Sequence, residues 1–201
     1  MTALPNAPAC ERNRQPILTV LQEELRDKSR VLEIGSGTGQ HAVFLGAALP
    51  RLRWQTSDLP EHHEGIRAWL EHAGLDNVWP PLSLDVESFD PGALSFDAVF
   101  SANTAHIMRL EAVRCTFELA GKVLEQGGVF CLYGPFNFDG RFSSDSNAAF
   151  DASLKQRDPA MGIRDIEQLD RFAATVGLSR VRLYAMPANN HVAVWQKETQ
   201  P

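Results

Sequence analysis

Short apolar runs alternate with longer segments in which apolar residues recur at helical spacing. The short runs are rich in β-branched and aromatic residues, as buried strands are. The predicted strands are 31–34, 53–58, 78–86, 96–101 and 129–133. The predicted helices between them are 41–49, 61–73 and 111–125. This alternation predicts an α/β fold with a mainly parallel sheet and helices on both faces.

Both ends of the chain extend this pattern. Pro16 suits the first turn of a helix through Arg26, and we expect Pro5 and Pro8 to keep the preceding residues extended. Beyond Tyr133, turn residues and phenylalanines dominate. The elements predicted after them are helices 147–155 and 163–176, strands 179–186 and 191–196, and a turn at 187–190. We therefore expect one domain over 1–201, with an N-terminal lid or helix at 1–29 and an active-site cover at 134–165.

Composition narrows the class of partner. The 201 residues carry a net charge of -6, which disfavours a general nucleic-acid or anionic-membrane surface. Cys10, Cys115 and Cys131 show no C-x-x-C spacing, so we expect neither a disulfide framework nor a metal site. The chain shows no signal-peptide pattern and no long apolar stretch, and we expect a cytoplasmic protein.

A glycine-rich turn is the strongest local signal. Glu33 lies near the end of the first predicted strand, and Gly35, Gly37 and Gly39 follow at alternate positions. Glycines let a ligand approach the backbone closely, and the following helix start suits an anionic group. The structural alternative is a tight connection between a strand and a helix.

Polar residues end three of the predicted strands. Asp58 lies about 20 residues beyond the last glycine, where a carboxylate can hold ribose hydroxyls. Asp85 lies at the end of the third predicted strand, and Asn103 follows the fourth. Ligands of open α/β sheets bind beyond the carboxyl ends of the strands, so we expect these residues to share one crevice with the glycine turn. The alternative for Asp58 is a helix N-cap.

Together these features resemble a class I S-adenosylmethionine-dependent methyltransferase. That resemblance implies a Rossmann-like sheet in the order 3-2-1-4-5-7-6 with the seventh strand antiparallel. Gln40 stands where the dinucleotide fingerprint has glycine or alanine, which counts against NAD. A closer resemblance is to the methyltransferase-like protein 26 family. The runs that carry it are 11–14, 16–18, 35–41, 84–86, 133–135, 146–147, 162–165 and 186–190.

The resemblance also implies site residues. The glycines would approach the methionine part of S-adenosylmethionine, Glu33 its ammonium, Asp58 the ribose, and Asp85 or Val86 the adenine. Arg14 would pair with the cofactor carboxylate, beside Asn13. The full predicted cofactor set is Asn13, Arg14, Glu33, Gly35, Ser36, Gly37, Thr38, Gly39, Gln40, His41, Asp58, Asp85, Val86 and Asn103.

The acceptor side is less constrained. His106 follows the fourth strand and is the favoured general base, with Tyr133 as a second catalytic candidate. The alternative for His106 is a histidine that packs or caps a helix start. The other candidates for an acceptor pocket are Asn137, Asn147, Arg164, Asn189 and Asn190.

An asparagine-rich rim would suit a small polar molecule. The sequence thus predicts a methyltransferase acting on a small-molecule acceptor. The alternatives are a non-catalytic module that binds S-adenosylmethionine and, with less support, an NAD-linked oxidoreductase.

Overall fold

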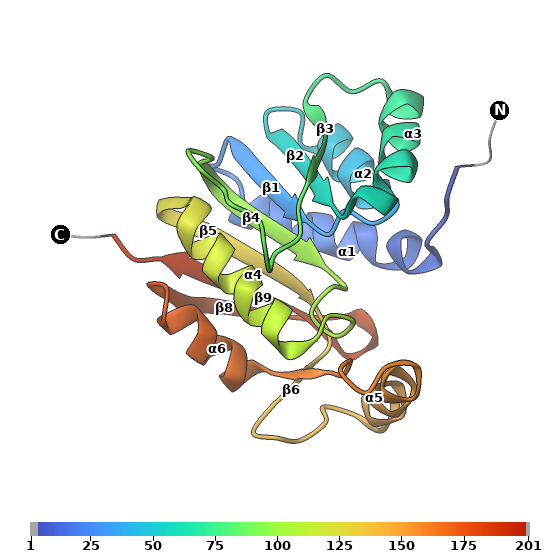
Figure 1. Cartoon of the computed structure of the whole chain (residues 1–201), viewed down its shortest axis with the longest axis vertical. Helices are drawn as coiled ribbons and strands as arrows, with labels where there is room; N and C mark the ends of the chain where they lie inside the picture. Colours follow the sequence, from blue (N-terminus) through green and yellow to red (C-terminus); the bar gives the residue numbers. More distant parts are fainter. Residues whose placement is uncertain (1–3, 200–201) are drawn as a thin grey trace.

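A seven-stranded sheet between two layers of helices forms the body of the protein (Figure 1). The computed structural model describes residues 4–199. The sheet has the order β3-β2-β1-β4-β5-β9-β8. Its strands are β1 (Arg30–Ile34), β2 (Arg53–Asp58), β3 (Val78–Ser83), β4 (Phe96–Ala102), β5 (Leu124–Gly134), β8 (Leu178–Met186) and β9 (Asn190–Lys197).

Strand pairing confirms the predicted fold class. β1 pairs in parallel with β2 and β4, and β4 pairs in parallel with β5. β9 runs antiparallel to both β5 and β8, so it is the one reversed strand of this sheet. Because the parallel strands share a direction, β1, β2 and β4 end at the same edge of the sheet. Their last residues there are Ile34, Asp58 and Ala102.

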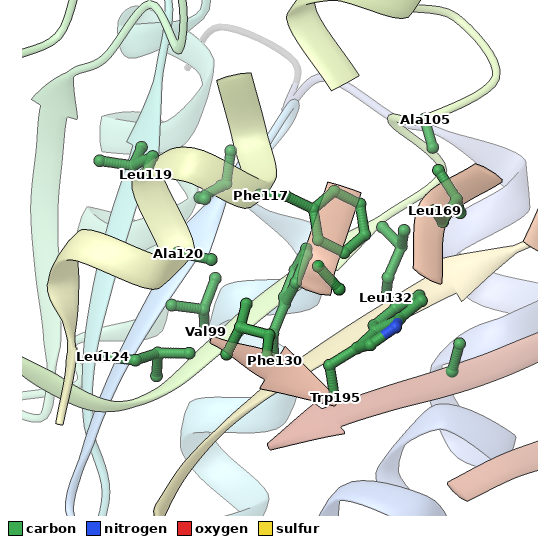
Figure 2. Close-up of a cluster of buried hydrophobic side chains, with 14 of the residues drawn as sticks. Val99, Ala105, Phe117, Leu119, Ala120, Leu124, Phe130, Leu132, Leu169 and Trp195 are labelled. Atoms are coloured by element: carbon green, nitrogen blue, oxygen red, sulfur yellow. The ribbon is translucent and has the colours of Figure 1, made fainter. Parts of the chain in front are cut away.

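Helices cover both faces and enclose two apolar clusters. On one face, α4 (Leu110–Val123) and α6 (Ile166–Ala174) cover a cluster that includes Phe117, Phe130 and Trp195 (Figure 2). The rings of Phe117 and Trp195 meet edge to face at 5.0 Å. On the other face lie α1 (Pro8–Glu24), α2 (Gln40–Ala48) and α3 (His63–Ala73), over a cluster that includes Trp54 and Phe100.

The N-terminal helix begins earlier than predicted. Pro8, rather than Pro16, occupies the first turn of α1, and Pro16 lies inside the helix. Proline at a helix start gives up only an N–H that would be unpaired anyway. Ile17 and Leu21 on the following turns are fully buried. Their burial stabilises the helix beyond Pro16. The first three residues of the predicted 1–29 segment lie outside the described residues.

Two other element boundaries differ from the predicted ones because of how the strands pair. β3 ends at Ser83, so Asp85 and Val86 lie in the loop after it rather than in the strand. Within 134–165, β6 (Phe136–Asn137) pairs with β7 (Arg164–Asp165), which delays the start of the last helix to Ile166. Between β6 and β7 lies α5 (Asp145–Arg157), capped by the Ser144 hydroxyl.

Short 3₁₀ turns, η1 (Pro60–His62) and η2 (Pro187–Asn189), complete the described chain. No helix within residues 4–199 has the length and apolar character needed to cross a membrane.

Candidate functional site

A cleft of about 1020 Å³ opens at the carboxyl ends of β1, β2 and β4. Its lining includes the glycine turn after β1, Asp58 at the end of β2, Asp85 and Val86 after β3, and Asn103 after β4. The N-terminal residues Pro5, Ala7, Ala9 and Cys10 form another part of its lining. The volume reaches the upper end of the usual range for small-molecule sites.

The glycine turn needs its glycines for different reasons. Gly35, Gly37 and Gly39 have φ values of 74°, 56° and 89°, which L side chains rarely adopt. A Cβ on Gly35 would lie 2.6 Å from Thr104 Cγ2, and one on Gly39 would lie 3.1 Å from the Ile66 backbone. A Cβ on Gly37 would meet nothing within 4 Å. Gly37 is therefore the glycine whose missing side chain leaves open space at the cleft.

Asp58 ties the end of β2 to this turn. Its Oδ2 accepts the Gly37 N–H at 2.7 Å, and its Oδ1 accepts the Leu59 N–H at 2.7 Å. A carboxylate has about four acceptor sites, so both oxygens can also accept from a ligand. Asp58 thus stabilises the turn and can also accept hydrogen bonds from two neighbouring hydroxyl groups of a ligand.

Glu33 supports the turn from beneath. It is almost fully buried, and its Oε2 accepts from the Ser36 hydroxyl at 2.8 Å and from Trp54 Nε1 at 3.1 Å. Burial raises the pKa of Glu33 to about 7, against the opposing effect of these two hydrogen bonds. Ser36 lines the cleft and Glu33 does not, so Glu33 borders the cleft only through its neighbours.

The loops after β3 and β4 form the far side of the cleft. Asp85 Oδ1 accepts the Glu87 N–H at 3.0 Å, which shapes the loop that presents Val86. Asn103 adopts φ 61°, a left-handed conformation that asparagine tolerates, and its N–H donates to the Tyr133 carbonyl at 2.9 Å. The structure therefore brings Asp58, Asp85 and Asn103 to one cleft, as the strand ends predicted, and Val86 lies beside them.

Gln40 lies in a different place from the predicted one. Its Oε1 accepts from the Ala7 N–H at 2.5 Å and from the Thr38 hydroxyl, and its Nε2 donates to Asn6 Oδ1 at 2.9 Å. Gln40 does not line the cleft, whereas Ala7 and Thr38 do. Gln40 therefore holds the N-terminal segment over the glycine turn.

Asn13 and Arg14 also lie outside the cleft lining. The Arg14 guanidinium stacks 4.7 Å from the centre of the Phe44 ring. Asn13 Oδ1 contacts His41 Nε2 at 2.7 Å in a buried setting. Of these residues, His41 is the one that lines the cleft.

His106 and Tyr133 do not reach the cleft either, in contrast to their predicted positions. The His106 ring meets the Phe150 ring of α5 at 5.3 Å, and burial lowers the pKa of His106 to about 4. Tyr133 is buried in the cluster beneath α1. His106 follows β4 as predicted, but its side chain packs beneath the 134–165 segment.

The residues predicted to form an asparagine-rich rim also lie outside the cleft lining. Asn147 donates to Ser143 and to the Asn189 carbonyl, and Arg164 donates to the carbonyls of Ala105 and Ala160. These bonds fasten the 134–165 segment to its surroundings. The predicted acceptor residues that are absent from the cleft lining are Tyr133, Asn137, Asn147, Arg164, Asn189 and Asn190.

Several lining residues carried no clear sequence signal. Cys10 reaches the cleft because α1 begins at Pro8. The sequence did not indicate this because Pro16 predicted a later start of the helix. Thr104 and Ile107 follow Asn103 in the same loop, and their proximity to it was the available signal. Asp158 and Ala160 come from the end of α5. The residues after α5 and the 3₁₀ turn η1 therefore contribute edges to a site centred on the sheet.

Negative charge dominates the lining. Arg109 is the one arginine among the described lining residues, and it already pairs with Glu87. No lysine appears in that described lining. The carboxylates are Asp58, Glu61, Glu64, Asp85, Glu87 and Asp158. Such a cleft favours neutral or cationic molecules over anions.

Comparison with known proteins agrees with this architecture. The family model described as "Protein of unknown function (DUF938)" matches residues 4–197. Among solved structures, an O-methyltransferase family protein from Burkholderia thailandensis superposes with a TM-score of 0.82 at 16% identity, over 96% of this chain and 59% of that chain.

Two further structures have the same fold. The S-adenosylmethionine-dependent methyltransferase SibL, in its apo form, gives a TM-score of 0.78 at 23% identity, over 94% of this chain and 56% of its own. Human N-acetylserotonin methyltransferase, in complex with SAM, gives a TM-score of 0.79 at 15% identity, over 95% of this chain and 53% of that chain. At these identities the likeness establishes the fold, and the chain spans little more than half the length of these proteins.

Proposed function

We propose that this chain, which belongs to the family described as "Protein of unknown function (DUF938)", is an S-adenosylmethionine-dependent methyltransferase acting on a small polar acceptor. The carrying observation is one cleft that joins the Asp58 carboxylate to the open space above Gly37. The closer resemblance to the methyltransferase-like protein 26 family and a cytoplasmic location are parts of the same proposal.

The residues present fit this cofactor. Asp58 accepts two ribose hydroxyls with the lone pairs that Gly37 and Leu59 leave available. Gly37 gives the methionine part access to the backbone, and Val86 and Asp85 meet the adenine. When bound, S-adenosylmethionine supplies a methyl group on a sulfonium that carries its own leaving group. The chain must therefore mainly orient the acceptor and exclude water.

The N-terminal segment and the 134–165 segment suit the exclusion of water. Ala7 and Cys10 line the cleft from α1 and the residues before it, and Asp158 and Ala160 line it from the end of α5. We propose the first as a lid and the second as a cover. Gln40 is the residue that holds the lid, through its bonds to Asn6 and Ala7.

The test is calorimetric titration with S-adenosylmethionine, followed by transfer of a radioactive methyl group to a library of small acceptors. Binding with turnover supports the methyltransferase. Binding without turnover on any acceptor indicates the non-catalytic binding module. Tight binding of NADH instead would favour an oxidoreductase. Gln40 argues against this alternative because it stands where the dinucleotide fingerprint has glycine or alanine.

A further inference from the structure

A polar chain connects Asn13, His41 and Cys10 at the α1 side of the cleft. His41 Nε2 lies 2.7 Å from Asn13 Oδ1, and His41 Nδ1 lies 3.6 Å from Cys10 Sγ. His41 and Cys10 line the cleft, whereas Asn13 lies behind them. His41 is only 6% exposed, so its two ring nitrogens have few partners besides these.

The partners determine which ring nitrogen carries the proton. An amide oxygen can only accept, so the contact with Asn13 Oδ1 requires a proton on His41 Nε2. The Asn13 amide nitrogen is thereby directed away from the ring. Nδ1 of the neutral ring is then an acceptor, and it faces the Cys10 thiol.

Cys10 is a partner that a ligand can displace. Burial, and next the charge of Glu33, raise the pKa of Cys10 to about 11, so the thiol keeps its proton at neutral pH. A thiol is a weak hydrogen-bond donor. A hydroxyl group entering the cleft would make a stronger bond to Nδ1 than the thiol does.

We infer that His41 Nδ1 is the proton acceptor for methyl transfer to a neutral hydroxyl group, with Asn13 as the positioning residue that fixes the ring. This inference rests on the proposed function, and it moves His41 from the predicted cofactor set to the acceptor side of the site. The acceptor oxygen forms its bond to the methyl carbon while the carbon–sulfur bond breaks and leaves its electron pair on sulfur. The hydroxyl proton passes to Nδ1, and the imidazolium later returns it to water.

The environment of His41 suits a hydroxyl better than an amine. Burial, and next the positive charge of Arg14, lower the pKa of His41 to about 4. So weak a base cannot deprotonate an ammonium group before attack. A hydroxyl oxygen, by contrast, keeps its lone pairs while protonated and becomes strongly acidic only as the new bond forms. Carboxylate and phosphate acceptors would meet a cleft in which Arg109, the one arginine of the described lining, is already paired with Glu87.

Nuclear magnetic resonance of the full chain, with 15N-labelled histidine and bound S-adenosylhomocysteine, tests the tautomer directly. His41→Gln assigns the signals. We expect a protonated Nε2 and a bare Nδ1, and we expect catechol, phenol or glycerol to shift the Nδ1 signal. A protonated Nδ1, or no shift with any of the three probes, would overturn the inference.

Kinetics supply the second arm, with tritiated S-adenosylmethionine and the same hydroxyl probes. His41→Gln should lower kcat by about 10²- to 10⁴-fold, the usual contribution of a general base, and leave the KM for S-adenosylmethionine within about threefold. The matched control is His72→Gln on the exposed side of α3, which should retain the activity of the unsubstituted chain. Equal losses in both variants, or a loss confined to cofactor KM, would contradict the assignment.

The two levels of the proposal fail differently. If the unsubstituted chain binds no S-adenosylmethionine, the proposed function is overturned. If it binds the cofactor but methylates none of the hydroxyl probes, or if Nδ1 is protonated, only the assignment of His41 is overturned.

Discussion

The Gly37 N–H donates to Asp58 Oδ2 at 2.7 Å, which fastens the turn after β1 to the end of β2. Gly37 follows β1 and Asp58 ends β2, so the two residues meet where these neighbouring parallel strands end. One carboxylate therefore shapes the backbone of the turn and faces the cleft that the turn borders. This double role makes the pair the centre of the proposed cofactor site.

Replacing Asp58 with alanine should weaken binding of S-adenosylmethionine by about 10- to 100-fold, because hydrogen bonds to a charged group contribute about 1.5–3 kcal/mol. Asp76→Ala is the matched control, since Asp76 is exposed in the turn between α3 and β3. Isothermal titration calorimetry measures both. Equal affinities for the two variants would remove Asp58 from the site.

Comparing Gly37→Ala with Gly74→Ala separates the effect of backbone strain from the effect of a methyl group that occupies the cleft. Gly37 and Gly74 have φ values of 56° and 60°, and a Cβ on either would meet nothing within 4 Å. Alanine at either position should therefore lower the free energy of unfolding by about 1–2 kcal/mol, the cost of a left-handed conformation. Only Gly37→Ala should also weaken cofactor binding. Denaturant unfolding and calorimetry measure the two effects, and unchanged affinity in Gly37→Ala would contradict the placement of the ligand.

Gln40→Ala should release the N-terminal lid. Loss of the acceptor for the Ala7 N–H and of the donor to Asn6 leaves residues 4–10 with fewer attachments to the glycine turn. Hydrogen–deuterium exchange should therefore accelerate in peptides covering these residues, while exchange in β4 and β5 stays unchanged. Unaltered exchange at residues 4–10 would show that Gln40 does not hold the segment.

Glu33 makes stability depend on pH. Burial raises its folded-state pKa to about 7, above its ordinary value of 4.5. The unfolded chain therefore ionises first, and the contribution of Glu33 is fully present below pH 4.5 and is lost as the pH rises to about 7. Glu33→Gln removes this loss and keeps an oxygen for Ser36 and Trp54. The melting temperature of Glu33→Gln minus that of the original chain should therefore increase as the pH rises from 4.5 to 7. A difference that stays constant over this range would disprove the raised pKa of Glu33.

The sequence predicted the sheet well because strand and helix periodicities in its central part agree with one another. It also predicted the meeting of Asp58, Asp85 and Asn103, since parallel strands bring their ends to one edge. These inferences depend on topology, which a repeated pattern encodes. They do not require knowledge of where any single side chain points.

Side-chain direction is what the sequence could not supply. His106 follows β4 as expected, yet its ring packs against Phe150 of α5, a contact set by distant parts of the chain. Gln40 belongs to the glycine-rich run, but its amide bonds to the N-terminal segment. Cys10 was missed because Pro16 suggested a later helix start than the one at Pro8. In each case a long-range contact decides the role of the residue.

Titration of the purified chain with S-adenosylmethionine in a calorimeter tests the central claim most directly. The account predicts saturable binding at one site, accompanied by a rise in melting temperature. In Asp58→Ala it predicts an affinity about 10- to 100-fold weaker and a smaller rise in melting temperature at the same cofactor concentration. Neither heat nor a thermal shift at millimolar cofactor would contradict it.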